Sequence, residues 1–207
     1  MENIWLNRAK RIQAIASCGL HYTDVAYDRE RYEELAALAN EMLSDLGNVP
    51  VSRIEGLVPD FAKGYATPRV DVRGAVIEDG RVLLVREKTD GNWALPGGFA
   101  DVGRSPAENI VKEIAEEAGI VVTARHLYDV RHKARHRYPA DTRDFYKLHF
   151  LCDRRERTAP EPGSETMEAA FFAPDALPPL SLDRTLPDDI TTAFTALREA
   201  GTATRFD

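Results

Sequence analysis

Three glutamates lie close together near the middle of this 207-residue chain, at positions 113, 116 and 117. On an α-helix, the i, i+3 and i+4 spacing of Glu113, Glu116 and Glu117 places their side chains on one face. Like charges at this spacing repel by about 0.2–0.5 kcal/mol per pair, whereas Mg²⁺ combines a few carboxylates with the phosphate oxygens of a substrate. The spacing therefore indicates metal-assisted chemistry on a phosphate compound, and the alternative is a solvated acidic helix face.

The glutamates lie on a segment that carries the signals of a complete helix. Ser105 and Glu108 can form a capping box around Pro106 at the first helical position. Gly119 is placed to end the helix in the left-handed conformation, and Lys112 is expected to point away from the glutamates. The apolar residues between these ends recur with a helical period and should face a core: Ala107, Ile110, Val111, Ile114 and Ala118.

A pair of glycines, Gly97 and Gly98, precedes the helix and follows a predicted strand at 92–96. Glycine lacks a Cβ atom and therefore lets the backbone approach a ligand closely. This turn makes the acidic helix a better candidate for a phosphate site than the glutamate spacing alone would.

Together these residues resemble the box of the Nudix hydrolases, G-x5-E-x7-R-E-U-x-E-E-x-G-U, in which U is a bulky apolar residue. The chain supplies Gly98 and, at 112–120, Lys-Glu-Ile-Ala-Glu-Glu-Ala-Gly-Ile. Arg104 stands where the family has its first glutamate, and Lys112 replaces the arginine. In the family those two side chains often pair and support the loop, which two cations cannot do. The similarity covers roughly residues 68–180.

The resemblance implies an α+β fold, with a Nudix-type mixed β-sheet sandwich flanked by helices. It also implies a hydrolase that depends on Mg²⁺, for which Mn²⁺ can substitute. Glu113, Glu116 and Glu117 would be the catalytic residues and the metal ligands, and a backbone carbonyl at Gly97 or Gly98 would add a ligand. Glu113 can also serve as the general base if the metal does not engage it fully.

Further candidate site residues lie outside the box. A second candidate for the base is a carboxylate near the predicted strand at 168–172, either Glu165 or Glu168. Four cations that could face substrate phosphates, and one ring that could stack on a base, complete the set: Arg104, Arg131, Lys133, Arg184 and Trp93. For all these residues the simpler interpretations are a solvated loop charge or core packing.

Two helices are expected near the N-terminus, over Glu2–Cys18 and Asp28–Gly47, followed by a short third helix after Pro50. Helices this short bury little apolar surface by themselves, so they should pack on the catalytic domain or on a second subunit. We therefore assign 1–62 to a helical N-terminal domain, for dimerisation or contact on the substrate side, and 63–207 to the catalytic domain.

The catalytic domain is expected to combine strands and helices. Two strands, 70–77 and 81–87, are joined across Asp79-Gly80, which is a strong hairpin signal. Further elements are expected near 126–133, 145–152 and 168–172 as strands, and over 187–200 as a final helix.

One Nudix subgroup combines a short helical domain with two sequence features that this chain also has. These are Val-Asp-Val-Arg at 70–73 and Trp-Ala-Leu-Pro-Gly-Gly-Phe-Ala-Asp-Val-Gly at 93–103. Members of the subgroup are described as ADP-ribose or CDP-choline pyrophosphatases and tend to be homodimers. The resemblance implies cleavage of a nucleoside diphosphate linked to another moiety, giving a nucleoside monophosphate and a phosphorylated product. Two alternatives stay open: a Nudix-fold module that senses such a nucleotide without cleaving it, and a hydrolase that processes RNA ends.

The composition limits the partners and the compartment. A net charge of −7 and a pI near 5.3 argue against a broad basic surface for nucleic acid, without excluding a local basic patch. Cys18 and Cys152 lie far apart and lack a C-x-x-C spacing, which indicates reduced thiols. No apolar run approaches a membrane-spanning length, and the first residues lack a signal-peptide core. We therefore expect a cytoplasmic protein without a membrane partner.

Overall fold

The computed structural model describes residues 3–48, 66–101, 103–199 and 203–207. Its contacts divide the chain into two compact units. The first unit comprises Met1–Arg69 with Ala134–Phe145, and the second comprises Val70–Lys133 with Tyr146–Asp207. No sequence signal had indicated that residues 134–145 group with the N-terminal helices.

The first unit contains a hairpin of two helices, α1 (Ile4–Tyr22) and α2 (Ala26–Gly47). The helices meet closely at Gly19, where an added Cβ atom would lie 2.4 Å from the ring of Tyr32. Leu6, Ala9 and Leu43 form their small buried cluster. The two expected helices are confirmed, and the expected third helix after Pro50 lies outside the described residues.

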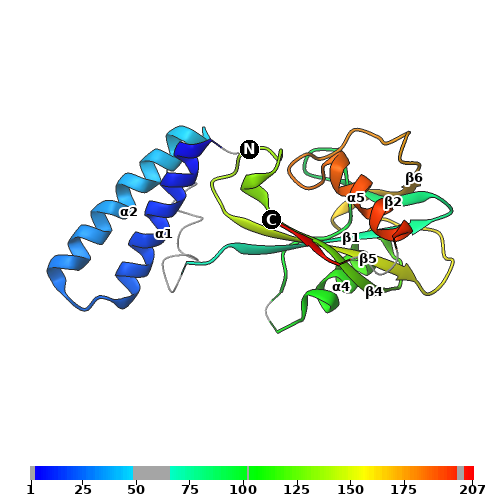
Figure 1. The fold of residues 1–207 in the computed structure, drawn as a ribbon, viewed down its shortest axis with the longest axis horizontal. Coiled ribbons are helices and arrows are strands. Elements are labelled where there is room, and N and C mark those ends of the chain that lie inside the picture. The colour runs from blue at the N-terminus through cyan, green and yellow to red at the C-terminus, as the bar shows by residue number, and fades with distance from the viewer. Residues whose placement is uncertain (1–2, 49–65, 102, 200–202) are drawn as a thin grey trace. The chain divides into compact units, whose positions relative to one another are not determined.

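The second unit is built on a sheet with the strand order β3-β2-β1-β5-β4-β7, to which β6 adds by pairing with β2 (Figure 1). Strand β4 pairs antiparallel with β5 and parallel with β7, so the sheet is mixed. The strands are β1 (Arg69–Glu78), β2 (Arg81–Glu87), β3 (Trp93–Ala94), β4 (Val122–His132), β5 (Phe145–Arg154), β6 (Thr166–Phe172) and β7 (Arg205–Phe206), and the helices are α4 (Pro106–Ala118) and α5 (Pro187–Arg198). The α+β prediction is confirmed, whereas β7 was not anticipated.

The hairpin expected at Asp79-Gly80 joins β1 to β2, which pair antiparallel with Glu78 opposite Arg81. Asp79 and Gly80 both have positive φ angles, 49° and 73°. Two successive positive φ angles are the geometry of the tight turn that suits strand twist, so the local sequence sets the register of this pair.

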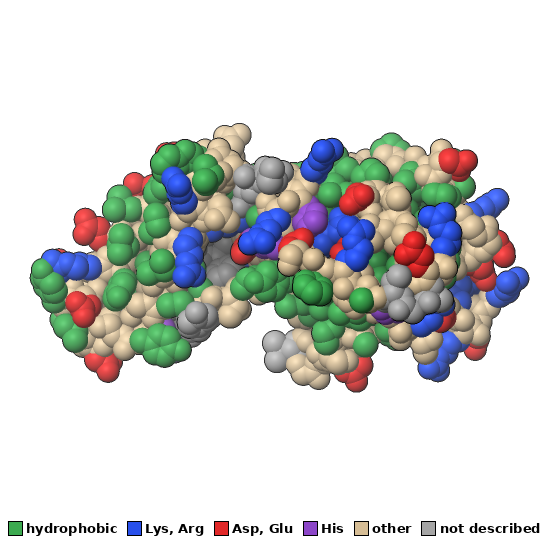
Figure 2. Space-filling model, in the orientation of Figure 1, with side chains coloured by type: hydrophobic (Ala, Val, Ile, Leu, Met, Phe, Trp, Pro, Cys, Tyr) green, Lys and Arg blue, Asp and Glu red, His purple; other side chains and the backbone are tan. Residues whose placement is uncertain are grey.

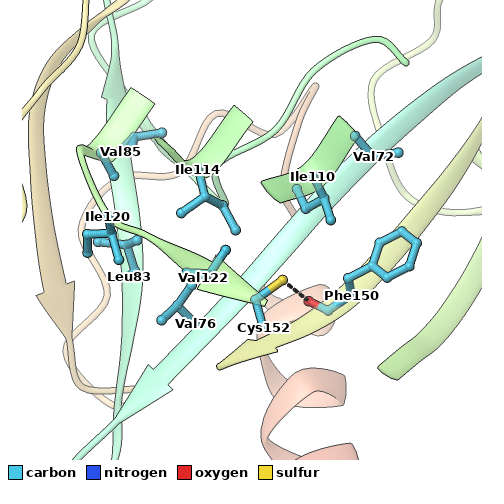
Figure 3. Close-up of a cluster of buried hydrophobic side chains, with 11 residues drawn as sticks. Val72, Val76, Leu83, Val85, Ile110, Ile114, Ile120, Val122, Phe150 and Cys152 are labelled. Atoms are coloured by element: carbon cyan, nitrogen blue, oxygen red, sulfur yellow. Dashed lines mark hydrogen bonds between the residues drawn. The ribbon is translucent and has the colours of Figure 1, made fainter. Parts of the chain in front are cut away.

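Two apolar clusters lie on opposite faces of the sheet, because successive side chains of a strand point to opposite faces. On one face Val72 and Val76 pack against Ile110 and Ile114 of α4 (Figure 3). On the other face Ala75 belongs to the cluster that includes residues of α5. Helix α4 is thereby fixed against β1, immediately beside the Gly-Gly turn.

Candidate active site

Helix α4 begins and ends as the sequence indicates. The Ser105 hydroxyl accepts a hydrogen bond from the Glu108 N–H (3.2 Å), and the Glu108 carboxylate accepts one from the Ser105 N–H (2.7 Å). Gly119 follows the helix with a φ of 64°. These caps fix the register of the helix and hence the direction of each glutamate side chain.

Glu117 points inward, toward the Gly-Gly turn. Its Oε2 atom accepts a hydrogen bond from the N–H of Gly97 (2.8 Å), and the residue is only 6% exposed. Burial raises the pKa of Glu117 to about 8, although the Arg73 guanidinium and the Gly97 N–H oppose this shift. The carboxylates of Glu87 and Glu113 raise this pKa further. A buried carboxylate repelled by two others is an environment that a cation would relieve.

The Gly-Gly turn is fixed against the beginning of β1. The Gly98 carbonyl accepts a hydrogen bond from the Val72 N–H (2.8 Å), and the Pro96 carbonyl accepts one from the Gly74 N–H (2.9 Å). A Cβ atom built on Gly98 would lie 3.1 Å from Oε2 of Glu113, so this carboxylate lies directly over the turn. Glu113 and Glu117 therefore both meet the Gly97-Gly98 backbone from α4.

Replacing Gly97 by alanine is expected to destabilise the fold strongly. Gly97 has a φ of 141°, and an added Cβ atom would lie 2.0 Å from the Val72 carbonyl oxygen, which belongs to backbone that cannot move aside. The strained backbone alone costs about 1–3 kcal/mol, and the overlap adds to it. Chemical denaturation of Gly97→Ala and Gly80→Ala measures the difference, because Gly80 has a φ of 73° but nothing within 4 Å of its added Cβ. Equal losses of stability in the two variants would contradict this expectation.

The side chain of Lys112 turns back over the acidic face, so the expectation that it points away is wrong. Its Nζ lies 3.0 Å from Glu116, 3.1 Å from Asp101 and 3.8 Å from Glu113. The hydrogen bonds to Glu116 and Asp101 raise the pKa of Lys112 above its usual value. Of the three box glutamates, Glu116 has the most exposed side chain, at 59%. The positive charge of Lys112 thus offsets part of the repulsion among the box glutamates, which a lysine pointing away would not do.

A divalent cation fits the chemistry of these residues, although their present arrangement does not enclose one. Within the described ranges, no three His, Cys, Asp or Glu side chains are close enough together to hold a metal ion. Burial is the first cause that raises the pKa values of partly buried Glu113 and buried Glu117, and the two carboxylates lie against consecutive residues of one turn. Carboxylate and carbonyl oxygens are the hard ligands that Mg²⁺ prefers.

Sequence reasoning missed a carboxylate that β2 brings to this site. Glu87 is the third residue, after Leu83 and Val85, on the face of β2 that packs toward α4. In the β2–β6 register it lies opposite Thr166, whose hydroxyl donates to the Glu117 carbonyl (2.7 Å). Glu87 is 7% exposed, and burial raises its pKa despite the opposing charges of nearby arginines. The signal that could have revealed Glu87 is its position, since a charged residue there follows two apolar residues on the same face of the strand.

Arg184, a candidate site residue from the sequence, lies beside Glu87. Its Nε is 3.3 Å from the Glu87 carboxylate, and its terminal nitrogens donate to Ser181 and Thr89, both at 2.9 Å. The Ser181 hydroxyl in turn donates to Asp90 (2.7 Å). These contacts join the turn after β2 to the segment around 181–185.

The structure places Arg131 and Lys133 differently from the expectation that they face phosphates from a loop. Arg131 is 1% exposed, and its guanidinium contacts Asp129 (2.5 Å) and Asp189 (2.7 Å). Lys133 is 8% exposed and lies 3.8 Å from Asp183. Because burying an unpaired charge is costly, the carboxylates around Arg131 give it a structural function inside the domain.

The other candidates outside the box lie in less favourable places. The Trp93 side chain is buried in the cluster on the α5 face, with its ring 4.7 Å from that of Phe172. Glu168 is exposed and pairs with Arg86 (2.7 Å), and Glu165 is also exposed. Arg104 is exposed and helps to lower the pKa of Glu108, whose carboxylate is stabilised first by the Ser105 N–H.

A group of buried charged side chains, which pair with one another, lies next to the candidate site. The Arg73 guanidinium donates two hydrogen bonds to Asp71, both 2.9 Å long, and a third to the Leu95 carbonyl (3.1 Å). Lys147 donates to Asp71 as well (2.8 Å). Burial opposes the charge of Asp71, but the two cations outweigh it and keep its pKa well below the usual range. Arg73 thereby stays charged between Asp71 and the Gly-Gly turn, where its field acts on Glu117.

The chain matches two described families over most of its length. Residues 67–194 match the NUDIX domain, and residues 3–58 match the family described as "UDP-X-like, N-terminal oligomerisation domain". The first match alone covers more than half of the chain. The protein is a Nudix hydrolase. The predicted Nudix family is thus confirmed, and Nudix hydrolases generally use divalent metal cations.

Similar proteins carry related descriptions. The chain is 45% identical, over 98% of its length and 97% of the relative's, to the Bacillus subtilis (strain 168) protein named "Putative ADP-ribose pyrophosphatase YjhB". A solved structure described as a UDP-X diphosphatase is 33% identical over 98% of both chains, with a TM-score of 0.63. An ADP-ribose pyrophosphatase from Streptococcus suis 89-1591 is 37% identical with a TM-score of 0.62, over 68% of this chain and 100% of that one.

Proposed function

We propose that this Nudix hydrolase cleaves the diphosphate of a nucleoside diphosphate linked to another moiety, in the presence of Mg²⁺ or Mn²⁺. The products are a nucleoside monophosphate and a phosphorylated remainder, and the leading substrates are of the ADP-ribose, UDP-sugar and CDP-choline type. The observation that carries the proposal is the pair of carboxylates of Glu113, which is partly buried, and Glu117, which is buried, both held against the Gly97-Gly98 backbone. The relatives described as ADP-ribose pyrophosphatase and UDP-X diphosphatase support the substrate class.

The metal site would consist of Glu113, Glu116 and Glu117 together with the carbonyl of Gly97. We favour this carbonyl because that of Gly98 already accepts a hydrogen bond from Val72. When bound, a divalent cation supplies charge neutralisation for the diphosphate and lowers the pKa of a coordinated water. Glu116 reaches this arrangement by exchanging its contact with Lys112, which is possible because its side chain is largely exposed.

The chain's own residues would handle the proton of the attacking water. Glu87 is the best-placed carboxylate outside the box, since it is buried next to the segment that contacts Glu117. A raised pKa brings a carboxylate closer to the range in which a general base works well, and Arg184 keeps Glu87 oriented. Glu165 and Glu168, the earlier candidates, lie in solvent.

The two alternative functions are less well supported. A nucleotide-sensing module has no need for a set of metal ligands, and this chain keeps all three box glutamates. A hydrolase of RNA ends would gain from a positive surface, whereas this chain carries a net charge of −7.

A substrate panel tests the proposal directly. Purified protein is incubated with ADP-ribose, a UDP-sugar, CDP-choline, nucleoside triphosphates and short 5′-triphosphate RNA, each with Mg²⁺, Mn²⁺ or a chelator. Metal-dependent release of a nucleoside monophosphate from one of the first three compounds is expected. Turnover of RNA alone, or tight nucleotide binding without any product, would favour one of the alternatives.

We also propose a homodimer formed through the N-terminal domain, residues 1–62, with 63–207 as the catalytic domain. Figure 2 shows hydrophobic side chains exposed over the N-terminal helices, and large apolar residues of α1 and α2 are 40–60% exposed, among them Ile4, Trp5, Leu35 and Leu38. Exposed apolar patches of this kind mark interaction surfaces. The match to a family described as an oligomerisation domain supports the same assignment.

No helix among the described residues is long and apolar enough to cross a membrane, and a cytoplasmic location stays a prediction.

A mass measurement checks the dimer. Light scattering on the intact protein is expected to give twice the chain mass of 23.1 kDa. The double variant Leu35→Lys/Leu38→Lys should shift the protein toward the monomer, because charges then replace apolar contacts in α2. The control is Val121→Lys/Leu182→Lys, which changes two side chains of the second unit with similar exposure, 51% and 48%. A monomeric parent protein would contradict the proposal.

A further inference from the structure

A buried asparagine connects the loop after the Gly-Gly turn to the helix that carries the glutamates. Asn109 is 0% exposed and lies on α4, four residues before Glu113. Its Oδ1 accepts a hydrogen bond from the Asp101 N–H (2.9 Å). Its Nδ2 donates to the carbonyl oxygens of Ser105 (3.1 Å), Asp101 (3.4 Å) and Arg104 (3.4 Å). We call this set of hydrogen bonds the Asn109 bridge.

Among the described residues, the Asn109 bridge is one of several connections between this loop and α4. Another is the hydrogen bond from the Gly97 N–H to Glu117 (2.8 Å), near the opposite end of α4. That bond uses a carboxylate that the proposed reaction requires as a metal ligand. It must therefore change when the carboxylate binds a cation.

The Asn109 bridge is independent of such changes, because it joins an amide only to backbone groups. It closes the loop between the Gly-Gly turn and the first turn of α4, so it limits how far Gly98 can move from Glu113. A nearby ion pair, from Lys112 to the Asp101 side chain (3.1 Å), holds the same loop from outside but also contacts Glu116. Of these contacts between α4 and the described part of the loop, the Asn109 bridge alone involves no side chain of a proposed metal ligand.

We propose that Asn109 is a positioning residue of the hydrolytic site, which holds the Gly98–Asp101 backbone at the separation from Glu113 and Glu117 that cation binding needs. This inference rests on the proposed function for its catalytic consequence but not for its structural one. Residues that orient metal ligands from behind typically contribute 10- to 100-fold to metal affinity or activity. In our proposal Asn109 acts in this way on the Gly98–Asp101 backbone and not on a glutamate side chain.

Two substitutions test the Asn109 bridge. Asn109→Asp keeps the size of the side chain and the acceptor for the Asp101 N–H but removes the donors, whereas Asn109→Ser shortens the side chain. The matched control is Asn40→Ser, which alters another buried asparagine, 9% exposed, on α2. Thermal unfolding first establishes which variants are folded at the assay temperature.

The decisive measurements are Mn²⁺ affinity by calorimetry without substrate, and kcat and KM on whichever diphosphate compound the parent hydrolyses. We expect folded Asn109 variants to bind Mn²⁺ about tenfold more weakly and to lose kcat by a similar factor, while Asn40→Ser matches the parent. A merely structural asparagine would lower the melting temperature and leave both quantities within twofold of the parent, which would overturn the proposal.

Hydrogen exchange of the parent protein gives a test that needs neither activity nor a folded variant. The Asp101 amide should exchange as slowly as amides inside α4, both with and without Mn²⁺. Fast exchange at Asp101 would overturn the inference about Asn109. Failure of the parent to hydrolyse any diphosphate compound would instead overturn the proposed function, and the exchange and Mn²⁺ results would still decide the positioning claim.

Discussion

Glu117→Gln is expected to lower turnover by a factor on the order of a hundred or more while making the metal-free protein more stable. A glutamine keeps the size of the side chain and can still accept the hydrogen bond from the Gly97 N–H. It removes one negative charge from the proposed metal site, where the cation supplies several kcal/mol of transition-state stabilisation. It also removes the burial of a charged carboxylate, which is what raises the pKa of Glu117 to about 8.

The pH dependence of stability gives the sign of this effect. The pKa of Glu117 is about 8 in the folded protein and has its usual value of 4.5 when the chain is unfolded. The folded state therefore holds this proton more tightly, so the contribution of Glu117 to stability is fully present below pH 4.5 and is lost as the pH rises toward 8. Melting temperatures of the metal-free parent should show this fall, and Glu117→Gln should show less of it.

Measuring rate and melting temperature on one variant separates a metal ligand from a solvated acidic residue. Asp153→Asn serves as the control, because that carboxylate is half exposed and pairs with Arg125 on the surface of β5. Added Mg²⁺ should raise the melting temperature of the parent and of Asp153→Asn, but much less that of Glu117→Gln. Full activity in Glu117→Gln, with an undiminished Mg²⁺ effect, would remove Glu117 from the site.

Glu87→Gln is expected to lower kcat on the order of a hundredfold, because general-base catalysis typically contributes 10²- to 10⁴-fold. The variant keeps the side-chain size next to Arg184 but loses the capacity to take a proton from the attacking water, together with the negative charge that pairs with Arg184. Mn²⁺ affinity should change much less than kcat, since Glu87 is not among the proposed metal ligands. Steady-state kinetics and calorimetry on the same preparation give the two numbers.

Glu168→Gln is the matched control for Glu87, as it changes a carboxylate on the neighbouring strand that pairs with Arg86 in solvent. Its kcat should stay within twofold of the parent, and Glu165→Gln should behave likewise. If Glu165→Gln or Glu168→Gln loses much activity while Glu87→Gln stays active, the general base is instead a residue of β6 or of the loop before it.

The sequence determined the helix of the site almost completely. The capping box at Ser105 and Glu108, Pro106 and the terminal Gly119 are local signals, and each depends only on residues within one turn. The Asp79-Gly80 hairpin is equally local, because two residues set its backbone angles. The i, i+3 and i+4 spacing then predicted correctly that the side chains of Glu113 and Glu117 would extend from one helix in the same direction, toward the Gly-Gly turn.

The tertiary structure decided which of the charged residues meet. Glu87 reaches the site through the pairing of β2 with β6, and Lys112 turns back because Asp101 lies within its reach. Arg131 became an interior residue because α5 supplies Asp189, fifty-eight positions later in the chain. A local sequence pattern cannot predict contacts between residues that lie this far apart in the chain. Burial, which raises the pKa of Glu117, likewise depends on the packing of α4, β1 and the Gly-Gly turn, so the environment of the glutamates is a property of the fold and not of their spacing in the sequence.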